Sequence, residues 1–113
     1  MFTLSIDDTV EVPVKFTLKS GKFNKQFSVT LIAKRLPQDE IAERLQAVEF
    51  KFLEFMLTDD LVTDWRDQRL VMDASGNPAE FGPEAFTLFL KTQGVAQACF
   101  NAYQRESGAK EKN

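Results

Sequence analysis

Histidine is absent from the 113-residue chain, and cysteine occurs once, as Cys99. The chain therefore lacks the side chain that most often acts as a general base or a metal ligand at neutral pH. A single cysteine excludes an internal disulfide framework and a multi-cysteine metal cluster. The glycine-rich phosphate loops and the GxSxG nucleophile motif are also missing. We expect no catalytic residues, no cofactor and no metal site, and hence a protein that is not an enzyme.

Long apolar runs are missing as well. No stretch approaches the roughly 20 apolar residues that span a bilayer, and the first ten residues lack the basic and hydrophobic regions of a signal peptide. The formal net charge is −3, whereas proteins that bind nucleic acids are usually basic. We expect no membrane span, no signal peptide and no nucleic-acid partner.

What is present is typical of one globular domain. Apolar residues make up 43% of the chain and charged residues 27%, which is enough apolar material for one modest core. We expect a single α+β domain over residues 1–104 and a flexible polar tail over residues 105–113. The charge is uneven, because residues 1–36 carry +3 and the remainder carries −6. The two oppositely charged parts either attract each other between copies in a homo-oligomer or are simply solvated faces.

Residues 10–33 contain two runs in which apolar and polar side chains alternate, separated by Ser20-Gly21-Lys22. This period of two is typical of half-buried strands, and Gly21 tolerates the positive φ of a tight turn. The pattern predicts an antiparallel β-hairpin. Because a lone hairpin is marginally stable in water, we expect a third strand from residues 2–6 or 69–72.

Three or more helices are predicted after the hairpin. Pro37 and the acidic residues that follow it indicate a helix start, and apolar residues then recur at helical spacing over residues 41–56. Pro83 indicates a second start, and Gly94 a stop. Residues 95–103 have the apolar face of a third helix, on which Cys99 is a small core residue.

Phenylalanine is abundant, with eleven copies in the chain. Apolar side chains cover nearly the whole circumference of the expected helix over residues 50–57. This segment is therefore either a core helix wrapped by the rest of the domain or a surface that contacts another protein. For the second alternative, the predicted partner-binding residues are Phe50, Leu53, Phe55, Leu57 and Trp65.

Five aspartates lie between residues 59 and 73. Such a cluster is either a solvated acidic stretch or, as an alternative function, the Mg²⁺ or Ca²⁺ site of a small hydrolase. A calcium loop beginning at Asp73 fails, because Pro78 occupies the position at which such a loop needs glycine.

A series of short motifs extends along almost the whole chain. From the N-terminus it consists of FTL at 2–4, the hairpin with Gly21, Lys34-Arg35, QDEIA at 38–42, LVTDW at 61–65, DASGNPAEF at 73–81, PEAF at 83–86, VAQACFNAY at 95–103 and Lys112-Asn113. In this order and spacing, the series resembles the tail assembly chaperones of long-tailed bacteriophages. The departures are Phe86 and Phe89, where the family more often has leucine, and the short turn at Gly21.

The resemblance implies a non-catalytic protein of the cytoplasm of the infected or lysogenic bacterial host that is absent from the mature virion. It implies binding to the tape measure protein, a long and largely helical apolar chain, and delivery of that protein to the tail tube protein. It also implies a homo-oligomer and a longer, frameshifted form; Lys110–Asn113 would be encoded by A-rich codons that suit a slippery site. The alternative is a structural head–tail connector or minor tail protein.

Overall fold

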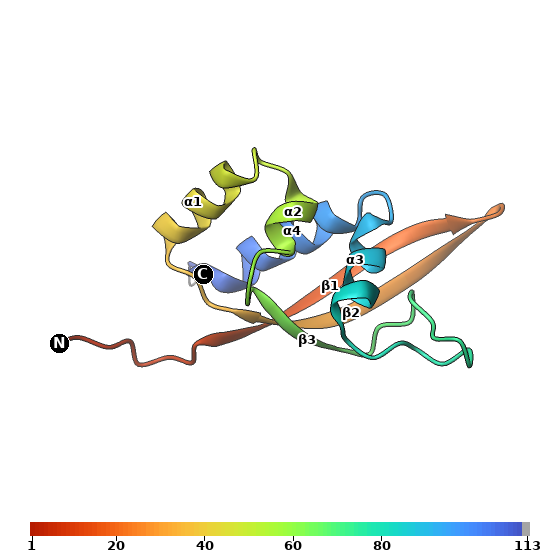
Figure 1. Ribbon diagram of the computed structural model, residues 1–113, viewed down its shortest axis with the longest axis horizontal. Coiled ribbons are helices and arrows are strands. Elements are labelled where there is room, and N and C mark those ends of the chain that lie inside the picture. Colours follow the sequence, from red (N-terminus) through yellow and green to blue (C-terminus); the bar gives the residue numbers. More distant parts are fainter. Residues whose placement is uncertain (112–113) are drawn as a thin grey trace.

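The computed structural model describes residues 1–111 and consists of a three-stranded sheet packed against helices (Figure 1). In chain order, the elements are β1 (Thr9–Ser20), β2 (Phe23–Lys34), α1 (Gln38–Ala47), α2 (Phe52–Met56), β3 (Val62–Arg66), α3 (Pro83–Lys91) and α4 (Val95–Ser107). The predicted α+β class, the N-terminal hairpin and the three or more helices are confirmed.

Strands β1 and β2 pair along their whole length, from Thr9 opposite Lys34 to Ser20 opposite Phe23. Gly21 adopts a φ of 62° in the turn between them, a conformation that costs glycine little because it has no Cβ. In the half of the hairpin that lies away from the turn, one face is buried. This face is formed by alternate residues of both strands. The other face and the turn are exposed, so only one side of the sheet contributes to the core.

The third strand is β3, and not residues 2–6 or 69–72 as predicted. It lies antiparallel to β2, with Trp65 opposite Leu31. Its short length and the single Asp64 obscured the strand pattern in the sequence, whereas in the structure Trp65 is buried beside Leu31. Residues 69–72 instead form part of a loop around the buried Gln68, whose side-chain amide donates to the carbonyl oxygens of Val71 and Ala79.

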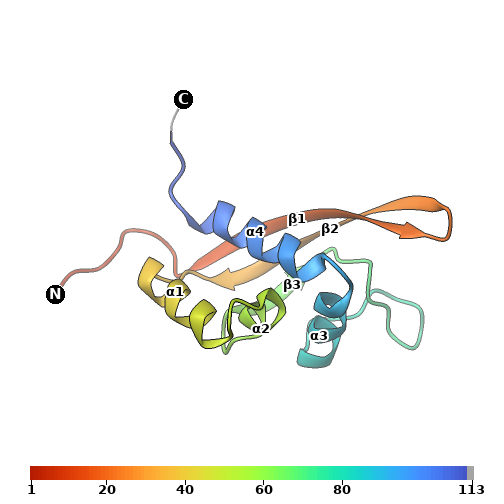
Figure 2. The same ribbon diagram turned by 90° about the horizontal axis from the view of Figure 1, so that it is seen from above.

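Helix α4 packs against β1, and α2 and α3 both pack against α4. Figure 2 shows α1, α2 and α3 following one another along the long axis of the molecule. Aromatic rings fill the space between these elements. The Phe55 ring lies edge-on to the Phe100 ring, with 5.3 Å between their centres. The centres of the Trp65 and Phe89 rings are also 5.3 Å apart. These rings join the helices to the sheet in one continuous core.

Helix α4 is longer than the sequence predicted. It extends through Ser107, so residues 105–107 are helical and do not belong to a flexible tail. Lys112 and Asn113, the last part of that predicted tail and of the proposed slippery-site segment, lie outside the described residues.

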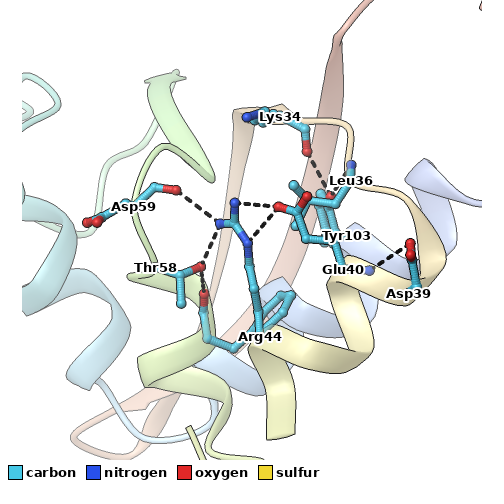
Figure 3. A network of polar contacts seen from close by, with 9 residues as sticks. Lys34, Leu36, Asp39, Glu40, Arg44, Thr58, Asp59 and Tyr103 are labelled. Carbon is cyan, nitrogen blue, oxygen red and sulfur yellow. Dashed lines mark hydrogen bonds and ion pairs between the residues drawn. The ribbon is translucent and has the colours of Figure 1, made fainter. Parts of the chain in front are cut away.

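The Tyr103 hydroxyl joins α4 to the end of β2 inside the core (Figure 3). It donates to the Lys34 carbonyl oxygen at 2.7 Å and accepts from the Leu36 amide at 3.2 Å. The ring and its hydrogen bond to the Leu36 amide are both buried, so water cannot readily replace that bond if the hydroxyl is removed.

We expect Tyr103→Phe to lower the free energy of unfolding by about 1–3 kcal/mol, because it removes the partner of the buried Leu36 amide and of the part-buried Lys34 carbonyl. Urea unfolding monitored by circular dichroism would measure the change. Gln97→Ala, at an exposed position of the same helix, is the control and should stay within about 0.5 kcal/mol of the parent protein. Equal effects of the two substitutions would contradict the assignment.

Burial raises the pKa of the Cys99 thiol to about 12, from an ordinary value of 9.0. The unfolded chain releases this proton at lower pH than the folded chain, so the free energy of unfolding should fall as pH rises above about 9. Urea titrations at a series of pH values would show a steeper decline for the parent protein than for Cys99→Ala. Parallel pH profiles would show that the thiol does not contribute.

Candidate partner-binding surface at the α1–α2 corner

The expected helix over residues 41–56 is interrupted by a turn between α1 and α2. We call this turn together with α2, residues 48–57, the α1–α2 corner. The Glu49 amide donates to the Gln46 carbonyl at 3.0 Å, and the Phe50 amide donates to the Leu45 carbonyl at 2.8 Å. This pair of bonds is a Schellman helix ending, which usually has glycine at the left-handed position. Here Glu49 occupies it with φ 56°, followed by Phe50 with φ 61°.

The corner leaves apolar side chains of the predicted surface exposed. Phe50 is 64% exposed and Leu57 is 36% exposed. Leu53 of α2 is half-buried and lies one helical turn before Leu57, the residue that caps the end of α2, so the two side chains are neighbours. Three of the five predicted partner-binding residues therefore lie close together in sequence and remain accessible.

The other two predicted residues, Phe55 and Trp65, lie in the core, which corrects their assignment to a partner surface. Phe55 is 0% exposed and packs on Phe100. Trp65 belongs to β3, its ring packs on both phenylalanines of α3, and its indole nitrogen donates to the Ala79 carbonyl at 3.2 Å. Helical spacing cannot separate Phe55 from the exposed residues, because the break in the helix changes the direction of the side chains after it.

Arg44 holds the two sides of the corner together (Figure 3). Its Nε and Nη2 donate to the Glu40 carboxylate at 2.9 and 2.6 Å, within α1. Its Nη1 donates to the Thr58 hydroxyl at 3.2 Å and to the Asp59 carbonyl at 3.0 Å, just beyond α2. The spacing of Glu40 and Arg44 predicts an ion pair on the helix, but nothing in the sequence indicates the tie to Thr58. That tie makes the corner a fixed feature of the surface.

Charge and apolar side chains also meet at the hairpin turn, far from the corner. Lys15, Lys19, Lys22 and Lys25 are all exposed on this half of the hairpin, and the Lys22 ammonium lies 5.4 Å from the centre of the exposed Phe23 ring. This is the basic end expected from the uneven charge, and the charge-steered contact between copies stays a prediction.

Two of the five aspartates between residues 59 and 73 accept hydrogen bonds from nearby backbone amides. Asp64 accepts a hydrogen bond from the Trp65 amide, and Asp73 accepts from the amides of Ser75 and Asn77. Within residues 1–111, no three histidine, cysteine, aspartate or glutamate side chains are placed to hold a metal ion. The hydrolase alternative therefore has no assembled metal site on this part of the chain.

We expect Glu49→Gly to raise the free energy of unfolding by up to about 1 kcal/mol, because glycine adopts the left-handed conformation without the clash of a Cβ. Ala47→Gly, two residues earlier but inside the helix, is the matched control and should lower it by about 1 kcal/mol. Urea unfolding of the two variants tests the corner directly. Destabilisation by both substitutions to the same extent would be inconsistent with a strained turn.

Comparison of the chain with known protein families, curated proteins and solved structures gives no match. Within residues 1–111, no helix has both the length and the apolar character needed to cross a membrane.

Proposed function

We propose that this protein is a tail assembly chaperone of a long-tailed bacteriophage, a non-catalytic protein that binds and solubilises the tape measure protein. The observation that carries the proposal is the exposed Phe50 ring, presented on a left-handed turn that Arg44 clamps in place. Left-handed conformations of residues other than glycine are costly, and they concentrate at functional positions.

The corner suits an apolar helical partner. Phe50, Leu53 and Leu57 present aromatic and aliphatic groups from a short stretch of chain, and an amphipathic helix supplies apolar anchors one turn apart. A surface that is already rigid loses little conformational entropy when it binds. Each contact is small, but several copies along one long tape measure chain would gain strength from multivalency.

The same proposal assigns the protein to the cytoplasm of the infected or lysogenic host and excludes it from the mature virion. Its further partners would be the tail tube protein, other copies of itself and a longer frameshifted form. These assignments rest on the order of motifs along the chain, from the FTL segment to the closing helix.

We expect Phe50→Ser to reduce co-purification with the tape measure protein encoded beside its gene by roughly tenfold or more, the equivalent of at least about 1.4 kcal/mol. The matched control is Phe23→Ser, which removes an equally exposed phenylalanine (69%) at the hairpin turn. Circular dichroism and urea unfolding would establish that both variants keep the fold. If Phe50→Ser and Phe23→Ser retain the tape measure protein equally, the corner is not its binding surface.

A further inference from the structure

The N-terminal segment, residues 1–6, presents largely exposed apolar side chains, whose exposed fraction is 101% for Phe2 and 54% for Ile6. Phe2, Leu4 and Ile6 alternate with Thr3 and Ser5, and all of these residues are exposed. The segment forms no strand, and Figure 1 shows it extending away from the sheet and the helices. None of its side chains is charged. It therefore has the pattern of a strand that lacks a surface to pack against.

A groove lined by apolar and uncharged polar side chains lies between α1 and the C-terminal end of α4. It has a volume of about 440 Å³, and its apolar wall includes Leu36, Ile41 and Leu45. Its polar wall includes Gln104 and Ser107, and none of its lining side chains is charged. Helix α1 has no fully buried residue, so its apolar face is incompletely covered. A ten-residue helix is marginal on its own and gains from having that face packed.

Neutrality distinguishes this groove from other hollows on the described surface. The cleft beside β3 includes Asp64 and Glu80, and the shallow hollow on α3 includes Glu84. The two hollows on the hairpin both include Lys15. Burial of an uncharged apolar segment against any of these would also desolvate a charge, which is costly without a partner. No charged side chain lines the groove between α1 and α4, and Arg35 at its edge is already paired with a backbone carbonyl of α4.

Arg35 separates the N-terminal segment from the groove of its own chain. Its amide donates to the Asp8 carbonyl at 2.7 Å, and its Nε donates to the Asp7 carbonyl at 3.3 Å. On the other side, its Nη1 donates to the Ser107 carbonyl at 2.9 Å, at the wall of the groove. Arg35 thus holds the base of the segment, and the segment extends away from the helices (Figure 1), so it would have to turn back at this base to reach its own groove. A second copy can offer its groove to the extended segment without that reversal.

We propose that the N-terminal segment is an exchange arm that docks into the α1–α4 groove of a second copy of this chain, with Phe2, Leu4 and Ile6 against its apolar wall. An extended stretch of six residues spans about 20 Å, and ten helical residues span about 15 Å, so the arm is long enough to lie along α1. Reciprocal exchange closes a dimer, whereas successive exchange builds a ring or an open spiral. The contact is independent of tape measure binding, since it uses other side chains than the α1–α2 corner.

Disulfide trapping between two singly substituted chains tests the proposal. One chain carries Leu4→Cys and the other carries Ala42→Cys, an exposed position on the groove. Cys99 is kept, because its thiol is buried. After mild oxidation of the mixture, we expect a covalent heterodimer in at least tenfold greater yield than from the control pair of Phe23→Cys and Ala42→Cys. Equal yields from the two pairs would overturn the proposal.

The double variant with Leu4→Cys and Ala42→Cys in one chain distinguishes docking in a second copy from docking in the groove of the same chain. A monomeric product with an internal disulfide, in place of linked dimers or longer species, would overturn the proposal. Light scattering of the full chain provides a second readout, in which Leu4→Asp should reduce the association that Phe23→Asp leaves intact. Retained association of the Leu4→Asp variant would count equally against the exchange arm.

Discussion

Burial of aromatic rings between the sheet and α4 is the interaction on which the rest of this structure depends. Phe55, Phe89 and Tyr103 are fully enclosed, and aromatic side chains bury more apolar area per residue than most others. Their packing orients α2 and α3 on α4 and brings β3 beside β2. It also determines which apolar residues remain outside, because a domain of this size has too little interior to enclose every large side chain.

The α1–α2 corner follows from that core. Phe52 and Phe55 must both reach Phe100 from a short stretch of chain, and a continuous helix from residue 38 to residue 56 is replaced by two helices joined by a tight turn. The left-handed residues at the turn point Phe50 outward, and Arg44 secures the geometry from the side of α1. The left-handed turn, the Arg44 hydrogen bonds and the exposed Phe50 ring therefore lie together. This is why we propose the corner as the partner-binding surface.

Self-association and partner binding involve separate surfaces in this scheme. The N-terminal segment and the α1–α4 groove both lack charged side chains and are incompletely covered, whereas the hairpin turn is basic. An arm that docks in a neighbouring copy would bury apolar side chains and support α1. The corner would then be repeated along an assembly, as binding to a long helical chain requires. The two proposals fail or succeed independently, because their tests alter different residues.

The sequence by itself determined the hairpin, its turn at Gly21, and the starts of α1 and α3, since alternation, glycine and proline act through local geometry. It also predicted a partner surface of five residues, Phe50, Leu53, Phe55, Leu57 and Trp65, of which Phe50, Leu53 and Leu57 remain accessible. Only the tertiary structure decided that β3 is the third strand, that the helix breaks at Glu49, and that Phe55 and Trp65 are buried. These outcomes depend on contacts between residues far apart in the chain, and a periodic pattern has the same appearance whether its apolar face meets the core or another protein.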